Sequence, residues 1–437
     1  MSLERLFSMN GVPCACGKTH RFDVKVLSGK GAVQQVPERV RQLGGSKVFV
    51  LFDANTKKAA GDLVLSLLQA AGIPYTTYCF PQAHLEPDEQ AVGSAIMYYD
   101  PSCDLILAVG SGVLNDIGKI VSMTSGHPYI IVGTAPSMDG YASATSSMTR
   151  DGLKISLPTR SADLIIGDTE ILKTAPLHMM KSGLGDMLAK YISICEWRYA
   201  HIICGEYYCE EIAVLVREAL QRCIEQADGL LRREDAAVEA VFEGLVIGGV
   251  AMNYAGLSRP ASGMEHYISH LIDMRTAEFG TPCDLHGIQC AVGTLIAARA
   301  YEKLKTVRPD REKALAHTAA FDFSAWSGTL RGLLGKGAES MIAQEAKERK
   351  YDPELHARRL DTILAHWDEI LAIVEEEVPP AAELEALLRK LDAPTTLQEL
   401  GTPDEMLPVL FRAAKDIRDK YVLSRLAWDL DITDELI

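Results

Sequence analysis

The first 175 residues alternate short, continuously apolar runs with longer amphipathic segments, and this alternation limits the fold more than any other feature. Runs at residues 46–53, 103–110 and 128–133 are apolar on both faces and end in Asp or Gly, which is typical of buried parallel strands. Residues 59–72 and the segment after Gly112 have the spacing of amphipathic helices. The pattern predicts an α/β domain in which each strand leads into a loop and a crossover helix.

Strand signals end with residues 163–167, and from about Pro176 nearly every segment has helical periodicity. In residues 210–231, for example, apolar positions recur three and four residues apart, which marks one buried helix face. We therefore expect a Rossmann-like α/β domain at residues 1–175 and an all-α domain at residues 176–437, with the boundary near residues 174–183.

The charge balance narrows the class of protein. The 437 residues include 44 Lys and Arg against 59 Asp and Glu, a formal charge of −15. This deficit of positive charge argues against a general nucleic-acid binder, which neutralises phosphates with Lys and Arg. It leaves room for a small phosphorylated substrate in one local pocket. Apolar stretches fall short of the roughly 20 residues that span a bilayer, and the start of the chain lacks the apolar core of a secretory signal. We expect a cytoplasmic homo-oligomer without nucleic-acid or membrane partners.

Ten cysteines are too few for a disulfide scaffold. The one tight Cys/His cluster in the sequence is Cys14, Cys16 and His20. A zinc or iron site is one interpretation, and a plain loop is the other. Three soft ligands without a clear fourth favour the loop.

Two turns after the predicted strands are suited to a nucleotide. Gly110 and Gly112 open a helix, where glycine allows close approach of a pyrophosphate and the helix N-terminus offers N–H groups. Asn115 stands where the Rossmann pattern has its third glycine, so the spacing departs from that pattern. Asp53 ends residues 46–53, where it can accept hydrogen bonds from a ribose, cap the next helix, or do both.

A third turn, at residues 133–143, is dense in hydroxyls and small side chains. Pro136 and Gly140 prevent it from continuing as strand or helix. It forms either a tight connection or the lining of a polar cleft. The two ligand-type turns on neighbouring predicted strands favour the cleft.

The strongest chemical signal is a group of histidines. His266 and His270 lie four residues apart and share a helix face, and His286 begins a new segment after a turn. Imidazoles with one carboxylate and an open position form a catalytic divalent-metal site, with zinc as the first choice. A single histidine is more often structural, but three within 21 residues favour the metal. Spacing alone does not choose the carboxylate.

Several motifs together resemble one family, the sn-glycerol-1-phosphate dehydrogenases. This is a branch of the superfamily of iron-containing alcohol dehydrogenases, glycerol dehydrogenases and dehydroquinate synthases. The resemblance runs from about residue 20 to residue 300, and more loosely beyond. Residues 134–143 and 258–266 are its specific parts. The motifs are Asp53, Gly110-Ser-Gly112, Asp116-Ile-Gly-Lys119, Thr134-Ala-Pro-Ser-Met-Asp139-Gly-Tyr-Ala-Ser143, Gly183-Leu-Gly-Asp186, Ser258-Arg-Pro-Ala-Ser-Gly-Met-Glu-His266 and Leu285-His286-Gly287.

The resemblance implies a dehydroquinate synthase-like fold and a set of site residues. Asp186, His266 and His286 would coordinate the metal. Asp139 and His270 would touch the substrate and take part in catalysis, and Asp186 would reach the substrate too. The contacts to the nicotinamide cofactor would come from Asp53, Gly112, Val113, Leu114, Asn115, Asp116, Thr134, Ala135, Pro136, Ser137 and Ser143.

The implied reaction is reversible hydride transfer between NAD(P)H and C2 of dihydroxyacetone phosphate, giving sn-glycerol 1-phosphate. Asp53 favours NAD because it repels a 2′-phosphate, while Lys57 and Lys58 offset it, so we expect NAD with tolerance of NADP. Zinc is the expected metal, and nickel or iron would fit the same ligands.

Arg259, just before the proposed ligand His266, suits a substrate phosphate by charge and geometry, and its alternative is a structural ion pair. Three other functions stay open: a dehydrogenase of an unphosphorylated polyol such as glycerol, a dehydroquinate synthase-like lyase, and a non-catalytic NAD-binding module. Dehydroquinate synthases typically have glutamate where Asp186 stands, so the aspartate favours a dehydrogenase.

Overall fold

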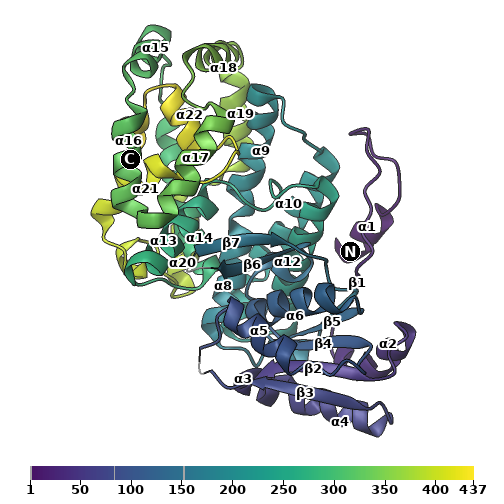
Figure 1. Cartoon of the computed structure of the whole chain (residues 1–437). Helices are drawn as coiled ribbons and strands as arrows, with labels where there is room; N and C mark the ends of the chain where they lie inside the picture. Colours follow the sequence, from purple (N-terminus) through teal and green to yellow (C-terminus); the bar gives the residue numbers. More distant parts are fainter. Residues whose placement is uncertain (1, 83, 151–152) are drawn as a thin grey trace. The chain divides into compact units, whose positions relative to one another are not determined.

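The computed structural model describes residues 2–82, 84–150 and 153–437 (Figure 1). Its contacts divide the chain into two compact units. The first consists of Met1–Met187 and Val214–Gly256, and the second of Leu188–Ala213 and Leu257–Ile437. This division differs from the single boundary expected near residues 174–183, because helix α12 (Asp235–Ala255) and nearly all of α8 (Leu177–Leu188) group with the sheet.

The first unit is built on a six-stranded parallel sheet in the order β1-β8-β5-β4-β2-β3, which confirms the predicted α/β class. The four predicted runs are its four inner strands. The edge strands β1 and β3 were not predicted, because each is only partly buried and lacks a continuous apolar run. The strands are β1 Lys25–Ser28, β2 Val48–Asp53, β3 Tyr75–Phe80, β4 Leu105–Gly110, β5 Tyr129–Gly133 and β8 Leu164–Gly167.

Both faces of the sheet are covered by helices. Alternate residues of β2, Val48, Val50 and Phe52, join the core cluster beneath α2 and α4, together with residues of the other central strands. The other face of β4 packs against α6, beside which α5 lies (Figure 1). This two-sided burial is what makes the central strands apolar throughout.

The remaining elements of the first unit are short helices and one antiparallel hairpin, β6–β7. The helix predicted at residues 59–72 begins with a π-helical turn, Lys57–Gly61, and continues as α4. The elements are α1 Ser2–Ser8, α2 Val36–Gln42, α3 Ala54–Thr56, α4 Asp62–Ala70, α5 Glu89–Met97, α6 Gly112–Ser125, β6 Thr145–Arg150, β7 Leu153–Pro158, α7 Thr169–Leu172 and α11 Ala227–Leu231.

The second unit contains helices and no strand, and all of its residues belong to the described part of the chain. Helices α13 and α14 of this unit pack against each other. The helix predicted at residues 210–231 is α10 followed by α11, and α10 passes from the second unit into the first. The helices are α9 Lys190–Cys204, α10 Glu210–Glu225, α13 Met264–Phe279, α14 His286–Leu304, α15 Arg311–Ala320, α16 Phe323–Leu334, α17 Ala338–Glu348, α18 Pro353–Ala365, α19 Trp367–Glu377, α20 Ala381–Lys390, α21 Leu407–Ala414, α22 Leu423–Asp429 and α23 Thr433–Leu436.

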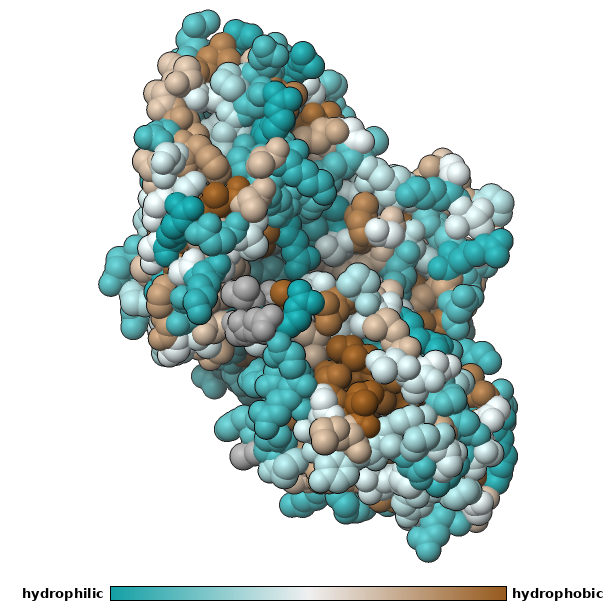
Figure 2. Space-filling model, viewed as in Figure 1, coloured by the Kyte–Doolittle hydropathy of each residue, from teal (hydrophilic) through white to brown (hydrophobic). Residues whose placement is uncertain are grey.

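The visible face of the molecule is mainly hydrophilic, with apolar side chains gathered in small patches (Figure 2). Among the described residues, no helix has the length and apolar character needed to cross a membrane.

The contact between α6 and β5 gives a test of the packing. Gly118 faces Tyr129, and a Cβ added at Gly118 would lie 2.5 Å from the Tyr129 hydroxyl oxygen. We expect Gly118→Ala to lower the free energy of unfolding by about 1–3 kcal/mol, because the core there has no room for a methyl group. Urea unfolding followed by circular dichroism measures this change.

The matched control is Gly93→Ala on α5, where nothing lies within 4 Å of the added Cβ. This variant should be neutral or gain about 0.5–1 kcal/mol, since alanine favours a helix over glycine. Equal stability of the Gly118→Ala and Gly93→Ala proteins would contradict the packing argument.

Candidate functional site

Three loops of the first unit meet at the carboxyl edge of the sheet. They follow β2, β4 and β5, which are neighbours in the sheet. In the sheet, β3 lies on one side of β2, and β4, β5 and β8 follow one another on the other side. The strand order therefore reverses between β2 and β4, and ligands of open α/β sheets bind at such a point.

Asp53, at the end of β2, forms a capping box with the start of α3. The amides of Asn55 and Thr56 both donate to Asp53 Oδ1, each at 2.8 Å. The capping role considered from the sequence is therefore present. Both bonds use Oδ1, so the capping role is compatible with the ribose contact predicted from the sequence.

The N-terminus of α6 follows β4. The first helical hydrogen bond runs from the amide of Asn115 to the carbonyl of Ser111, at 2.9 Å. The amides of Gly112, Val113 and Leu114 precede that bond, so they point out of the helix as donors for an anion. This arrangement is suited to a pyrophosphate.

The side chain of Asn115 has a structural role. It is fully buried; its Nδ2 donates to the carbonyl of Gly140 at 3.0 Å, and its Oδ1 accepts from the Tyr129 hydroxyl at 3.1 Å. The residue that replaces the third Rossmann glycine thus joins α6 to the loop after β5 and to β5 itself.

Lys119 is a residue that the sequence reasoning left without a role. Its side chain is fully buried, and Nζ donates to the carbonyl of Gly140 at 2.7 Å and to Ser143 Oγ at 3.1 Å. Burial lowers the pKa of Lys119, and the nearby Asp116 carboxylate, at 3.3 Å, opposes that shift. Lys119 and Asp116 lie three apart on α6, a spacing that signals an ion pair. Lys119 therefore joins α6 to the loop after β5, with Asp116 and Ser143 among its partners.

That loop, residues 134–143, is packed closely against α8. A Cβ on Gly183 would lie 1.9 Å from the carbonyl oxygen of Pro136, so only glycine allows this approach. Ser182 Oγ donates to the carbonyl of Ser137 at 2.9 Å. The loop residues Thr134, Ala135 and Ser137 are buried, and Pro136 lies among them.

The same loop contacts the carboxylate of Asp186. The amide of Asp139 donates to Asp186 Oδ2 at 2.9 Å, and Asp186 is fully buried. The structure thus brings the two acids of the predicted substrate site together within the first unit.

In the second unit, α13 and α14 gather the three predicted histidines. The ring centroids lie 5.0 Å apart for His266 and His286, and 5.9 Å apart for His270 and His286. His266 Nδ1 is 2.8 Å from Glu265 Oε1, and His286 Nδ1 is 3.1 Å from Ser269 Oγ. Partners on Nδ1 fix the orientation of both rings, and the Glu265 carboxylate is an acceptor of the kind found beside ligating histidines. The donor set therefore fits a divalent metal ion.

Cys290 is a further member of this cluster that sequence reasoning missed. Its Sγ lies 3.6 Å from His286 Nε2. Burial alone would raise the pKa of the Cys290 thiol, but the electrostatic interactions and hydrogen bonds with His266 and His286 outweigh it and lower the pKa. The sequence pattern that could have identified Cys290 is its position four residues after His286, one helical turn along α14.

Arg259 is placed in the structural ion pair considered as the alternative to phosphate binding. Its Nε donates to Glu206 Oε2 at 2.6 Å, its Nη2 pairs with the other oxygen of Glu206, and its Nη1 donates to the carbonyl of Tyr421 at 2.8 Å. The side chain is 2% exposed. These partners occupy the planar guanidinium and favour the structural ion pair over the predicted contact with the substrate phosphate.

Comparison with known proteins agrees with this architecture. The sequence pattern of iron-containing alcohol dehydrogenases matches residues 27–176. A glycerol-1-phosphate dehydrogenase, NAD(P)+, of Halalkalibacterium halodurans is 33% identical over 294 residues, which cover 66% of this chain and 74% of that protein. The enzyme of the same name from Bacillus licheniformis is 27% identical over 93% of this chain and 90% of its own length.

The chain belongs to the iron-containing alcohol dehydrogenase family. A crystal structure of 1,3-propanediol oxidoreductase has the same fold, with a TM-score of 0.61 at 17% identity over 96% of this chain and 99% of that one. Membership confirms the resemblance stated from the motifs. It implies a nicotinamide cofactor, a metal ion and a small-molecule substrate.

The ion pair of Arg259 leads to a stability prediction. Arg259→Ala leaves Glu206 without its bidentate partner, and we expect a loss of about 3 kcal/mol in the free energy of unfolding, as for broken buried ion pairs. Urea unfolding measures it. The control is Arg358→Ala, an exposed arginine of α18, for which we expect a change within about 0.5 kcal/mol. Equal losses in the two variants would refute a structural role for Arg259.

Proposed function

We propose that this chain is a metal-dependent NAD(P)H oxidoreductase that interconverts dihydroxyacetone phosphate and sn-glycerol 1-phosphate. The observation that carries the proposal is the similarity of this chain to enzymes named glycerol-1-phosphate dehydrogenase. In one of these enzymes, the aligned region covers 74% of the enzyme's length. The histidine cluster and the three loops at the sheet edge support it, because they offer donors for a metal and for a dinucleotide.

In this proposal Asp186, His266 and His286 hold the metal, with zinc the first choice and nickel or iron as alternatives. Asp53 and the amides at the start of α6 bind the cofactor, NAD with tolerance of NADP. When bound, the metal ion polarises the ketone oxygen and the reduced nicotinamide supplies the hydride. Asp139 and Asp186 contact the substrate from the first unit.

Reduction of the ketone at C2 adds one hydride to carbon and one proton to oxygen. We propose that His270 delivers the proton, directly or through one water. It lies one turn from His266 on α13, and its ring stacks on His286. A histidine titrates near neutral pH, so it can both give a proton in reduction and take one in oxidation.

The proposal also includes a cytoplasmic location and assembly into homo-oligomers. All ten cysteines lie in the described part of the chain, and they are thiols without disulfides. Such usage is typical of proteins in a reducing compartment. Size-exclusion chromatography with light scattering gives the assembly state.

The reaction is tested with dihydroxyacetone phosphate and NADH. We expect NADH oxidation that stops after the metal is chelated and returns when zinc, nickel or iron is added, with sn-glycerol 1-phosphate as the product. Absorbance follows NADH, and chiral analysis identifies the product. Since Arg259 is committed to Glu206, glycerol with NAD+ is tested in parallel. Faster turnover of glycerol would favour the unphosphorylated polyol and contradict the proposal.

Two histidine variants separate metal binding from proton transfer. We expect His270→Ala to keep its metal but to lower kcat by about 10²-fold or more, the usual contribution of a general acid. His266→Ala should lose the metal as well as the activity. Plasma mass spectrometry measures the metal, and His84→Ala, an exposed histidine of the first unit, is the control. Loss of metal from His270→Ala would make His270 a ligand.

A further inference from the structure

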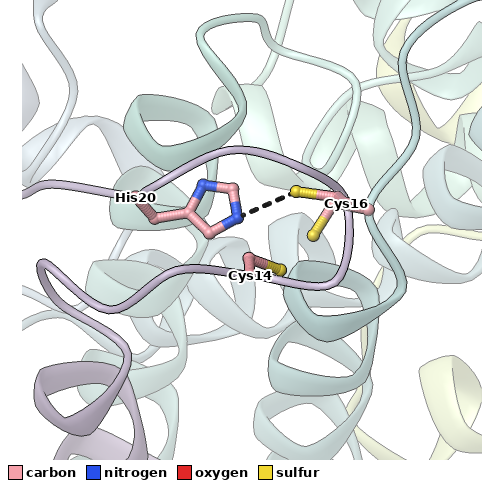
Figure 3. A group of neighbouring side chains, drawn as sticks. Cys14, Cys16 and His20 are labelled. Atoms are coloured by element: carbon pink, nitrogen blue, oxygen red, sulfur yellow. Dashed lines mark hydrogen bonds between the residues drawn. The ribbon is translucent and has the colours of Figure 1, made fainter.

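The segment between α1 and β1 folds into a tight loop that carries Cys14, Cys16 and His20. The amide of Cys14 donates to the carbonyl of Lys18 at 2.8 Å, and the amide of Gly17 donates to the carbonyl of Cys14 at 3.0 Å. Gly17 has a φ of 83°, a left-handed conformation that glycine adopts without strain. These contacts close the loop so that its three soft side chains turn toward one another (Figure 3).

His20 is held as a ligating histidine would be. The ring is 2% exposed, and its Nδ1 lies 3.0 Å from the carbonyl oxygen of Tyr254 on α12. Since a carbonyl only accepts hydrogen bonds, Nδ1 carries the proton and Nε2 presents its lone pair. That nitrogen lies 3.5 Å from Cys16 Sγ. A backbone carbonyl on the second ring nitrogen is the usual partner of a metal-bound histidine.

The spacing of the donor atoms suits one ion. The Cys14, Cys16 and His20 donor atoms lie within 4.8 Å of one another. In a tetrahedral zinc site, bond lengths of about 2.3 Å to sulfur and about 2.0–2.1 Å to nitrogen put sulfur and nitrogen about 3.6 Å apart. The distance of 3.5 Å between Cys16 Sγ and His20 Nε2 matches that edge.

We propose that Cys14, Cys16 and His20 bind a structural Zn²⁺ ion in the first unit, separate from the histidine cluster of α13 and α14. Both thiols release their protons to solvent as the ion binds. Two thiolates and one imidazole occupy three positions of a tetrahedron, and the fourth ligand is to be identified by experiment. This proposal differs from the sequence analysis, which favoured a plain loop.

The site would fasten the N-terminal segment to α12. Besides its bond to His20, Tyr254 donates its hydroxyl to the carbonyl of Leu6 at 2.9 Å, and the ring of Phe22 meets its ring edge-on. One residue earlier on α12, Asn253 donates to the carbonyl of Ala142 at 2.6 Å. The ion would therefore brace the helix that supports the loop after β5.

The zinc content of the 437-residue chain, expressed with zinc in the medium, tests the proposal. We expect Cys14→Ser/Cys16→Ser to contain about one zinc ion per chain fewer than the unmodified protein. The matched control replaces two exposed cysteines, Cys79→Ser/Cys283→Ser, and should lose none. Circular dichroism checks that each protein is folded. Equal zinc in all three proteins would overturn the proposal.

A second measurement needs no variant and so does not depend on folding of the mutant. In the unmodified protein, zinc should slow alkylation of Cys14 and Cys16 several-fold relative to the chelated form, while Cys79 and Cys283 react alike in both. Peptide mass spectrometry measures the alkylation of each of these four cysteines. Alkylation of Cys14 and Cys16 at the same rate with and without zinc would refute the site.

Cobalt replacement identifies the ligands. Thiolate-to-cobalt charge transfer should be absent in Cys14→Ser/Cys16→Ser and present in Cys290→Ser, which removes the one thiol of the histidine cluster. X-ray absorption of the zinc protein counts sulfur ligands and so assigns the fourth position. A charge-transfer band lost only in Cys290→Ser would place the thiolate metal in the histidine cluster and contradict the proposal.

Discussion

The buried backbone of the loop after β5 needs hydrogen-bond partners, and much of the first unit is arranged to supply them. A buried polar group of the main chain costs free energy unless it is paired. Side chains from α6, α8 and α12 supply these partners to residues 134–143. Lys119 and Asn115 both donate to the carbonyl of Gly140. Ser182 donates to the carbonyl of Ser137, Asn253 donates to the carbonyl of Ala142, and Asp186 accepts from the amide of Asp139. The loop is thereby fixed before any ligand binds.

This constraint explains why several residues of the family resemblance have structural partners. Asn115 joins α6 to the loop, and Asp116 accepts from the amide of Ser147 on β6. Ser143 donates to the carbonyl of Gly140 within the loop, and Asp53 caps α3. A rigid frame of this kind is what a cofactor site requires, because preorganised donors lose little entropy on binding. The backbone amides of α6 and the second oxygen of Asp53 are the groups that we propose bind the nucleotide.

Much of the fold could be predicted because its signals are local. The inner strands are buried on both faces and so read as apolar runs, whereas the edge strands β1 and β3 are half exposed and gave no such signal. The four-residue spacing of His266 and His270 placed them on one helix face. The return of His286 to that face depends on the packing of α14 against α13, which spacing alone suggests but does not fix.

The sequence by itself determined the α/β class, the helical second half, the three ligand-type turns and the histidine pair, because each depends on residues close together in the chain. The tertiary structure decided which distant residues pair with one another. Arg259 pairs with Glu206, 53 positions away, and His20 with Tyr254, 234 positions away. No local pattern selects such partners among many similar side chains, since the choice follows from which helices pack together. For the same reason only the folded chain shows that Arg259 has structural partners and that His20 lies beside Cys16.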